Sequence, residues 1–197
     1  MITATSSDLD LALAFYETYL PSGQDQALID RVNKTDFYPA FNVISDALHR
    51  EVIIALCRIW DTRTDTADIN RLAEAFHDPA VIAGLRAAGH VIMSAKLTRW
   101  LSEVDAVNKS EELNALKRAR HRAIAHTATP VEPYKGKARI AQYGDERKLL
   151  ERTIPLVEQA GAFVGCSYAT PFDDQRRLRR EHAAKFWKNL GALKTID

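Results

Sequence analysis

Hydrophobic residues recur every three or four positions along most of the chain, which is the spacing that lines one face of an α-helix. The clearest run comprises Phe41, Ile44, Leu48, Val52, Leu56 and Ile59. This run predicts one long helix that ends near Trp60 and Asp61, because the residues that follow are mainly Thr and Asp.

Capping residues predict where the next helices begin. After the polar break, Asp65 or Thr66 is the expected N-cap of a short helix. Asp78 followed by Pro79 starts another, because Pro suits the first helical position. Residues 79–107 are expected to form one bent helix or two short ones.

The second half of the chain has the same helical character with one interruption. Ser110, followed by two glutamates, predicts the start of a basic helix of about 16 residues. Residues 130–144 contain Pro and Gly and are predicted to form a loop, with a short strand over 138–143. Helices are expected again over 145–163 and 173–190.

These elements amount to roughly two-thirds helix, which indicates an all-α fold built as an antiparallel helical bundle. The length of 197 residues fits a single domain, and no internal repeat or interdomain linker is present in the sequence. An extra basic helix at the C-terminus completes the predicted architecture.

Composition excludes several protein classes. With 46% hydrophobic and 27% charged residues, the chain is neither disordered nor collagen-like. Cys57 and Cys166 are far apart and form no C-x-x-C pair, so no disulfide framework or thiolate zinc site is expected. No apolar run approaches the ~18 residues of a membrane span, and no signal peptide is recognisable, so we expect a cytoplasmic protein without a membrane partner.

Cofactor and metal sites are not expected either. The sequence contains no glycine-rich loop of the kind that holds a dinucleotide or a nucleoside triphosphate. His121 and His126 are five residues apart rather than four, and no carboxylate cluster accompanies them.

Charge is unevenly distributed although the net charge is only +1. Residues 1–40 contain six acidic residues against Arg31 and Lys34, whereas residues 113–139 contain seven basic residues against Glu132 alone. The second stretch is therefore the candidate for contact with an anionic partner.

One residue of this basic stretch conflicts with the helical pattern. On a helical wheel Arg120 falls in the same stripe as Leu113, Leu116, Ala123 and Ile124. An unpaired guanidinium facing a core is costly. Either it reaches the edge of the bundle or pairs with an acid such as Glu51 or Asp105, or it faces a polar cavity or a subunit interface.

The segment L-K-R-A-R-H-R-A-I-A-H, residues 116–126, resembles the R-x(4-6)-H signature of HEPN domains. Together with Y-P-A-F-N-V-I-S-D-A-L-H-R-E-V-I-I-A-L-C-R-I-W-D, residues 38–61, it is similar to the AbiU2 branch of that superfamily, which is named for abortive phage infection. The resemblance covers residues 35–165 as a HEPN-like core, and residues 170–197 would be a C-terminal helical extension.

The resemblance implies a helical domain that dimerises and cuts RNA without a metal. His126 would be the general base or acid and Arg120 the phosphate clamp. His121 would be a supporting polar group of the catalytic set, with a second acid/base group or an incidental residue as the alternatives. On an ideal helix Arg120 and His126 are about 120° apart, so the helix would unwind before His126 or the partner subunit would complete the site. The expected RNA-binding residues are Arg118, Arg122, Lys135 and Lys137.

Alternatives remain at the level of the sequence. Arg118, Arg122 and His126 share a helix face and would also suit a solvated surface. The basic C-terminal helix would either grip RNA or, as we favour, be a solvated face whose Leu178, Phe186, Trp187 and Leu190 belong to the core.

Function is therefore open between three interpretations. The first is a toxin-type endoribonuclease acting on tRNA or mRNA as a homodimer, with an antitoxin or nucleotidyltransferase partner. The second is a non-catalytic helical RNA-binding or protein-interaction module, and the third is a structural helical dimer.

Overall fold

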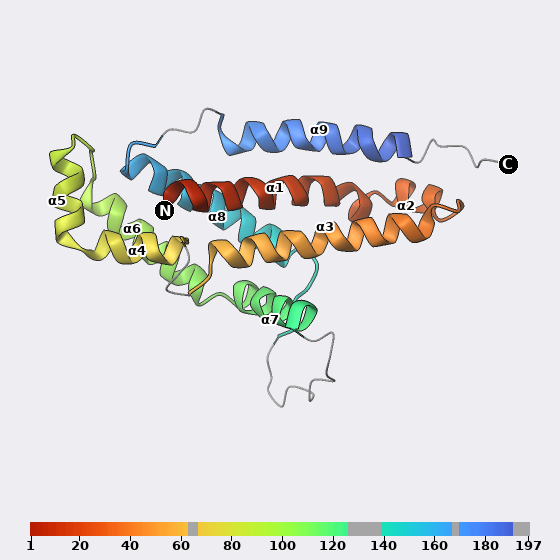
Figure 1. Cartoon of the computed structure of the whole chain (residues 1–197), viewed down its shortest axis with the longest axis horizontal. Helices are drawn as coiled ribbons and strands as arrows, with labels where there is room; N and C mark the ends of the chain where they lie inside the picture. Colours follow the sequence, from red (N-terminus) through yellow and green to blue (C-terminus); the bar gives the residue numbers. More distant parts are fainter. Residues whose placement is uncertain (63–66, 126–138, 167–169, 191–197) are drawn as a thin grey trace. The chain divides into compact units, whose positions relative to one another are not determined.

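The computed structural model describes residues 1–62, 67–125, 139–166 and 170–190. For residues 122–125 it describes the backbone alone. Within these ranges all regular secondary structure is helical (Figure 1). The helices are α1 (Ile2–Gln24), α2 (Gln26–Val32), α3 (Tyr38–Ile59), α4 (Ile69–His77), α5 (Pro79–Ala87), α6 (Ser94–Asn108), α7 (Glu111–Ala125), α8 (Asp145–Phe163) and α9 (Phe172–Leu190). The prediction of an all-α helical bundle is confirmed.

The chain forms two compact units. The first unit comprises Met1–Leu9 and Ile53–Ala169, and the second comprises Asp10–Val52 and Thr170–Asp197. Helices α4 to α8 belong to the first unit and α2 and α9 to the second, while α1 and α3 contribute residues to both.

Aromatic rings form much of the core of the first unit. The ring of Phe76 packs edge-on against Trp100 and Phe163, with centroid distances of 5.4 and 5.6 Å. The indole N–H of Trp100 donates to the backbone carbonyl of Leu156 at 2.8 Å, so its polar atom is satisfied within the core. Trp60 and Trp100 are both fully buried.

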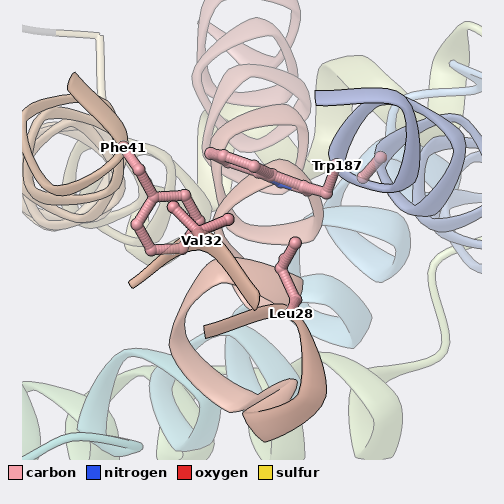
Figure 2. Packing of buried hydrophobic residues seen from close by; sticks show 5 residues of the cluster. Leu28, Val32, Phe41 and Trp187 are labelled. Atoms are coloured by element: carbon pink, nitrogen blue, oxygen red, sulfur yellow. The ribbon is translucent and has the colours of Figure 1, made fainter. Parts of the chain in front are cut away.

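A smaller cluster forms the core of the second unit (Figure 2). Leu28 and Val32 of α2 meet Phe41 of α3 and Trp187 of α9, and Ala183 completes the cluster. The rings of Phe41 and Trp187 are arranged edge to face at 5.1 Å. This packing explains why α2, although only seven residues long, is ordered against its neighbours.

Helix α9 is attached to α1 mainly through arginine side chains. Arg176 and Arg180 both bind the carboxylate of Glu17, which is completely buried, and Arg179 binds Asp10. These three guanidiniums of α9 are therefore paired with acids of the same unit, which disfavours the interpretation of α9 as an RNA grip.

The predicted core face of α9 is correct for Trp187 and wrong for two other residues. Leu178 and Phe186 are 44% and 48% exposed. Leu178 lies about 180° from Trp187 around an ideal helix, so both cannot face α1. The contacts with α1 orient α9 so that Trp187 is covered and Leu178 is not.

Several helix boundaries differ from the predicted ones. Helix α4 is capped by Asp68, whose carboxylate accepts from the backbone N–H groups of Asn70 and Arg71, rather than by Asp65 or Thr66, which lie outside the described residues. Residues 79–107 form two helices, because Gly89 has a positive φ of 88° and ends the first one.

The predicted strand over 138–143 is wrong for its described part, because residues 139–142 have no regular structure and Tyr143 lies in a turn. The backbone of Arg139 is bound by a side chain of α7 instead of by a neighbouring strand. The predicted helices over 145–163 and 173–190 are confirmed, with the second starting one residue earlier. Within the described residues no helix is both long enough and apolar enough to cross a membrane.

Candidate functional site

The basic helix α7 begins where the sequence predicted. The hydroxyl of Ser110 accepts a hydrogen bond from the backbone N–H of Leu113 at 3.3 Å, and two glutamates occupy the first turn. Leu113 and Leu116 are buried. This apolar face packs within the first unit and thereby fixes the direction in which the later residues of α7 point.

Arg120 lies on the buried side of α7, and its side chain is only 20% exposed. Its Nη1 lies 3.5 Å from Oδ2 of Asp61, whose side chain is 16% exposed. The partner is thus neither Glu51, which is exposed, nor Asp105, which pairs with Lys109 just after the end of its own helix. The carboxylate that faces Arg120 thus belongs to Asp61, which follows the end of α3, and not to a residue on the face of a neighbouring helix.

The contact between Arg120 and Asp61 is loose for a buried pair. A bidentate guanidinium–carboxylate pair has two N···O distances of about 2.7–2.9 Å. Here one nitrogen approaches one oxygen at 3.5 Å, and the guanidinium donates no hydrogen bond to any residue that the structure describes. As far as the described residues are concerned, most of the five N–H donors of Arg120 are therefore available to a further acceptor.

Asp61 itself is held firmly by its neighbours. Its Oδ1 accepts from the backbone N–H of Thr62 at 2.8 Å, and its backbone carbonyl accepts from the side-chain amide of Asn70 at 2.7 Å. Asn70 in turn accepts from the amide of Asn108 on α6 at 2.6 Å. Helices α4 and α6 thus position the carboxylate that faces Arg120.

Two further titratable side chains lie near this pair. Burial raises the pKa of the Cys57 thiol to about 11, against a smaller lowering by Arg120 and Lys117. Burial also lowers the pKa of Lys117, while Cys57, Asp61 and other charges act on it more weakly. The site is therefore a partly buried cluster of two cations, one carboxylate and a neutral thiol.

Lys117 and Asp61 were not predicted from the sequence as members of this site. Lys117 carries a usable signal, because at about 100° per residue it lies only about 40° from Leu113, in the same stripe as Arg120. Asp61 carries none, since the acidic residues that follow α3 are indistinguishable from one another without the tertiary contacts.

The raised pKa of Cys57 leads to a testable difference between the two cysteines. At pH 8 we expect iodoacetamide to alkylate Cys166, which is half-exposed, and to leave Cys57 intact, because only the thiolate reacts. Peptide mass spectrometry of the native and the unfolded protein measures this. Equal alkylation of both cysteines in the native protein would contradict the burial of Cys57.

The same pKa has a consequence for stability. Because the folded-state pKa of about 11 exceeds the ordinary 9.0, the stabilising effect of the protonated thiol is complete below pH 9 and is lost as pH rises toward 11. We expect this loss, measured by urea unfolding, to be absent in Cys57→Ala.

The remaining candidate residues on α7 are not gathered around Arg120. His121 is exposed, and as the next residue it lies about 100° from Arg120 around the helix. Arg118 donates from Nη2 to the backbone carbonyl of Arg139 at 2.8 Å, and Arg139 binds Asp145 at the start of α8. Arg118 thus helps to hold the chain that leads into α8.

Four of the predicted site residues lie beyond what the structure describes. Arg122 is part of α7, but its side chain is outside the described set, and His126, Lys135 and Lys137 are outside the described residues altogether. Within the described residues no three His, Cys, Asp or Glu side chains gather as metal ligands would.

Comparison with known proteins tests the resemblance noted above. The family model described as HEPN AbiU2 matches residues 4–186, which extends the similarity beyond residues 35–165 into α1 and α9. No curated protein and no solved structure matched the chain. Since the family match covers most of the sequence, the chain belongs to the AbiU2 family of HEPN domains.

Proposed function

We propose that this protein is a metal-independent endoribonuclease of the toxin or phage-defence type. It would cleave RNA by attack of a 2′-OH on the adjacent phosphodiester, leaving a 2′,3′-cyclic phosphate. Membership of the AbiU2 family supports an abortive-infection role, and the residues around Arg120 support the chemistry.

The observation that carries the proposal is the state of Arg120. Its guanidinium is largely buried at the basic end of α7 and contacts its carboxylate partner with a single nitrogen at 3.5 Å. An arginine keeps its charge at any physiological pH and presents a fork of donors that matches two phosphate oxygens. A fixed cation of this kind stabilises the negative charge that develops on the non-bridging phosphate oxygens during the reaction.

The proton transfers require groups that titrate near neutral pH. A base takes the proton of the 2′-OH as the new O–P bond forms, and an acid protonates the 5′ oxygen as its P–O bond breaks. We assign one of these steps to His126, which follows Arg120 by six residues in the sequence. His121, exposed on α7, is assigned a supporting role near the leaving strand.

The partners follow from the same proposal. The substrate is RNA, either tRNA or mRNA, with phosphate contacts from Arg122, Lys135 and Lys137 in addition to the site itself. We propose a homodimer that brings two copies of α7 together, and an antitoxin or nucleotidyltransferase that controls the activity. No cofactor is required for this chemistry.

A second candidate function is a non-catalytic RNA-binding or protein-interaction module of the same fold. The observation that favours it is the Arg120–Asp61 pair, because a carboxylate already opposes part of the charge that catalysis would use. The two candidates differ in whether a cleaved product forms.

The test is cleavage of tRNA and of structured mRNA by the purified protein in EDTA, with analysis of the product ends. We expect 2′,3′-cyclic phosphate ends. Because general acid–base catalysis contributes about 10²–10⁴ in rate, His126→Ala should lower the single-turnover rate by that factor. Arg120→Ala should lower it by about 10²–10³, the usual contribution of an oxyanion-stabilising group.

Two substitutions on exposed helix faces serve as controls. His182→Ala and Arg99→Ala remove the same chemical groups from α9 and α6 and should leave the rate unchanged. Cleavage by His126→Ala at the parental rate would reject its catalytic role. Salt-sensitive RNA binding without any product would establish the non-catalytic module instead.

A further inference from the structure

Lys117 and Arg120 present two positive charges on the same side of α7. They are three residues apart, and their directions differ by about 60° around an ideal helix. Both side chains are partly buried beside Leu113 and Leu116, in the stripe that packs inside the first unit. Burying two cations together is unfavourable unless an anion balances them.

The acidic groups near these cations come from two places in the fold. Asp61 follows α3 and offers Oδ2 to Arg120, while its Oδ1 accepts from the backbone of Thr62. Asp68 also acts on Lys117, but its carboxylate caps α4, where it accepts from two backbone N–H groups. The helix N-terminus thus offsets the charge of Asp68. Asp61, which lies 3.5 Å from Arg120 and acts on Lys117 through its charge, is left as the carboxylate that opposes both cations.

We propose that Lys117 joins Arg120 in binding one phosphodiester of the RNA, and that Asp61 is a positioning residue that orients the two cations in the absence of RNA. The inference rests on the proposed function and deepens it by adding a second phosphate ligand to the site. Lys117 supplies a compact charge and Arg120 a planar fork, so the two contact different oxygens of one phosphate.

Asp61 has two opposing effects in this arrangement. It competes with the phosphate for the two cations, which weakens binding. Its backbone carbonyl is anchored to Asn70, so its carboxylate also keeps the guanidinium near one position although their contact is loose, which favours the geometry needed for reaction. Removing its charge without changing its shape should therefore separate affinity from rate.

The experiment measures binding and cleavage separately on the full chain. Binding uses fluorescein-labelled single-stranded RNA in which every 2′-OH is methylated, so that cleavage by 2′-OH attack is blocked, and it is followed by fluorescence anisotropy between 50 and 200 mM salt. Losing one phosphate contact lowers the slope of log K against log salt by about 0.7. We expect this change in Lys117→Gln, with roughly fivefold weaker binding at 0.1 M salt.

Matched variants distinguish a phosphate ligand from a structural residue. Lys117→Arg keeps the charge and should retain the parental salt slope, and Lys96→Gln removes an exposed lysine of α6 and should have no effect. Asp61→Asn, which preserves the hydrogen bond from Thr62, should bind the methylated RNA roughly threefold more tightly. With unmodified RNA it should cleave at least roughly tenfold more slowly.

The inference is overturned if Lys117→Gln has the salt slope of Lys96→Gln, or if Asp61→Asn binds more weakly than the parent protein. These results are distinguishable from failure of the nuclease proposal. If the parent protein cleaves RNA and Lys117→Gln binds and cleaves normally, the nuclease proposal stands and Lys117 is rejected as a second phosphate ligand. If the parent protein yields no product but Lys117→Gln loses salt-dependent binding, the nuclease proposal is rejected and the phosphate-binding site stands.

Discussion

Replacing Glu17 with alanine should destabilise the protein by about 3–5 kcal/mol, because it removes one partner of a buried ionic cluster. The Glu17 carboxylate is inaccessible to solvent and accepts from Nε of Arg176 at 2.8 Å and from Nε of Arg180 at 2.9 Å. In Glu17→Ala the Arg176 guanidinium, 17% exposed, would lose its main counter-charge. Urea unfolding followed by circular dichroism measures the change in the free energy of unfolding.

Two comparisons identify the cause of that loss. Asp10→Ala breaks a more exposed pair with Arg179 and should cost less than about 1 kcal/mol. Replacing both Glu17 and Arg176 with Met should recover part of the loss, because the buried guanidinium is removed with its partner and Arg180, whose side chain is 55% exposed, remains accessible to solvent. If Glu17→Ala cost no more than Asp10→Ala, the buried cluster would not be what holds α9 to α1.

Replacing Trp60 with alanine should destabilise the first unit by about 3–5 kcal/mol, the usual cost of removing a buried large aromatic side chain. Trp60 is fully buried, and its indole N–H donates to the hydroxyl of Thr153 on α8 at 2.9 Å. Since Asp61 is the next residue, the cavity would also release the carboxylate that faces Arg120. Thermal and urea unfolding measure the first effect, and the cleavage rate measures the second.

A graded series separates volume from hydrogen bonding at this position. Trp60→Phe retains most of the ring and should cost about 1–3 kcal/mol, which includes the lost hydrogen bond to Thr153. Val91→Ala, at a residue that is 86% exposed, should change stability by less than about 0.5 kcal/mol. Equal losses in Trp60→Phe and Trp60→Ala would assign the effect to the hydrogen bond alone.

Helix termini with a local signal were predictable from the sequence. Ser110 caps α7 because its hydroxyl reaches an N–H only three residues away, and the Asp78–Pro79 pair starts α5 in the same way. Asp68 was missed as the cap of α4 because the polar stretch before it contains several acceptable capping residues. Only the packing of Leu72 and Phe76 selects among them.

The first 40 residues show where periodicity fails as a predictor. They form α1 and α2, which the hydrophobic pattern did not predict. The buried positions of α1 include Thr5, Glu17 and Ser22, which read as polar in the sequence. Glu17 is buried because two arginines more than 150 residues away satisfy it, and no local pattern carries that information.

The sequence by itself determined that the chain is helical, where α3, α7, α8 and α9 lie, and that Arg120 occupies an otherwise apolar stripe. These properties depend on spacings of a few residues, which the 3.6-residue turn of a helix converts directly into faces and ends. Only the tertiary structure decided that Asp61 faces Arg120, that Lys117 lies beside them, and that Arg176 and Arg180 are used to bury Glu17. Electrostatic partners are chosen by proximity in space, so a charge anomaly can be found in the sequence while its partner cannot.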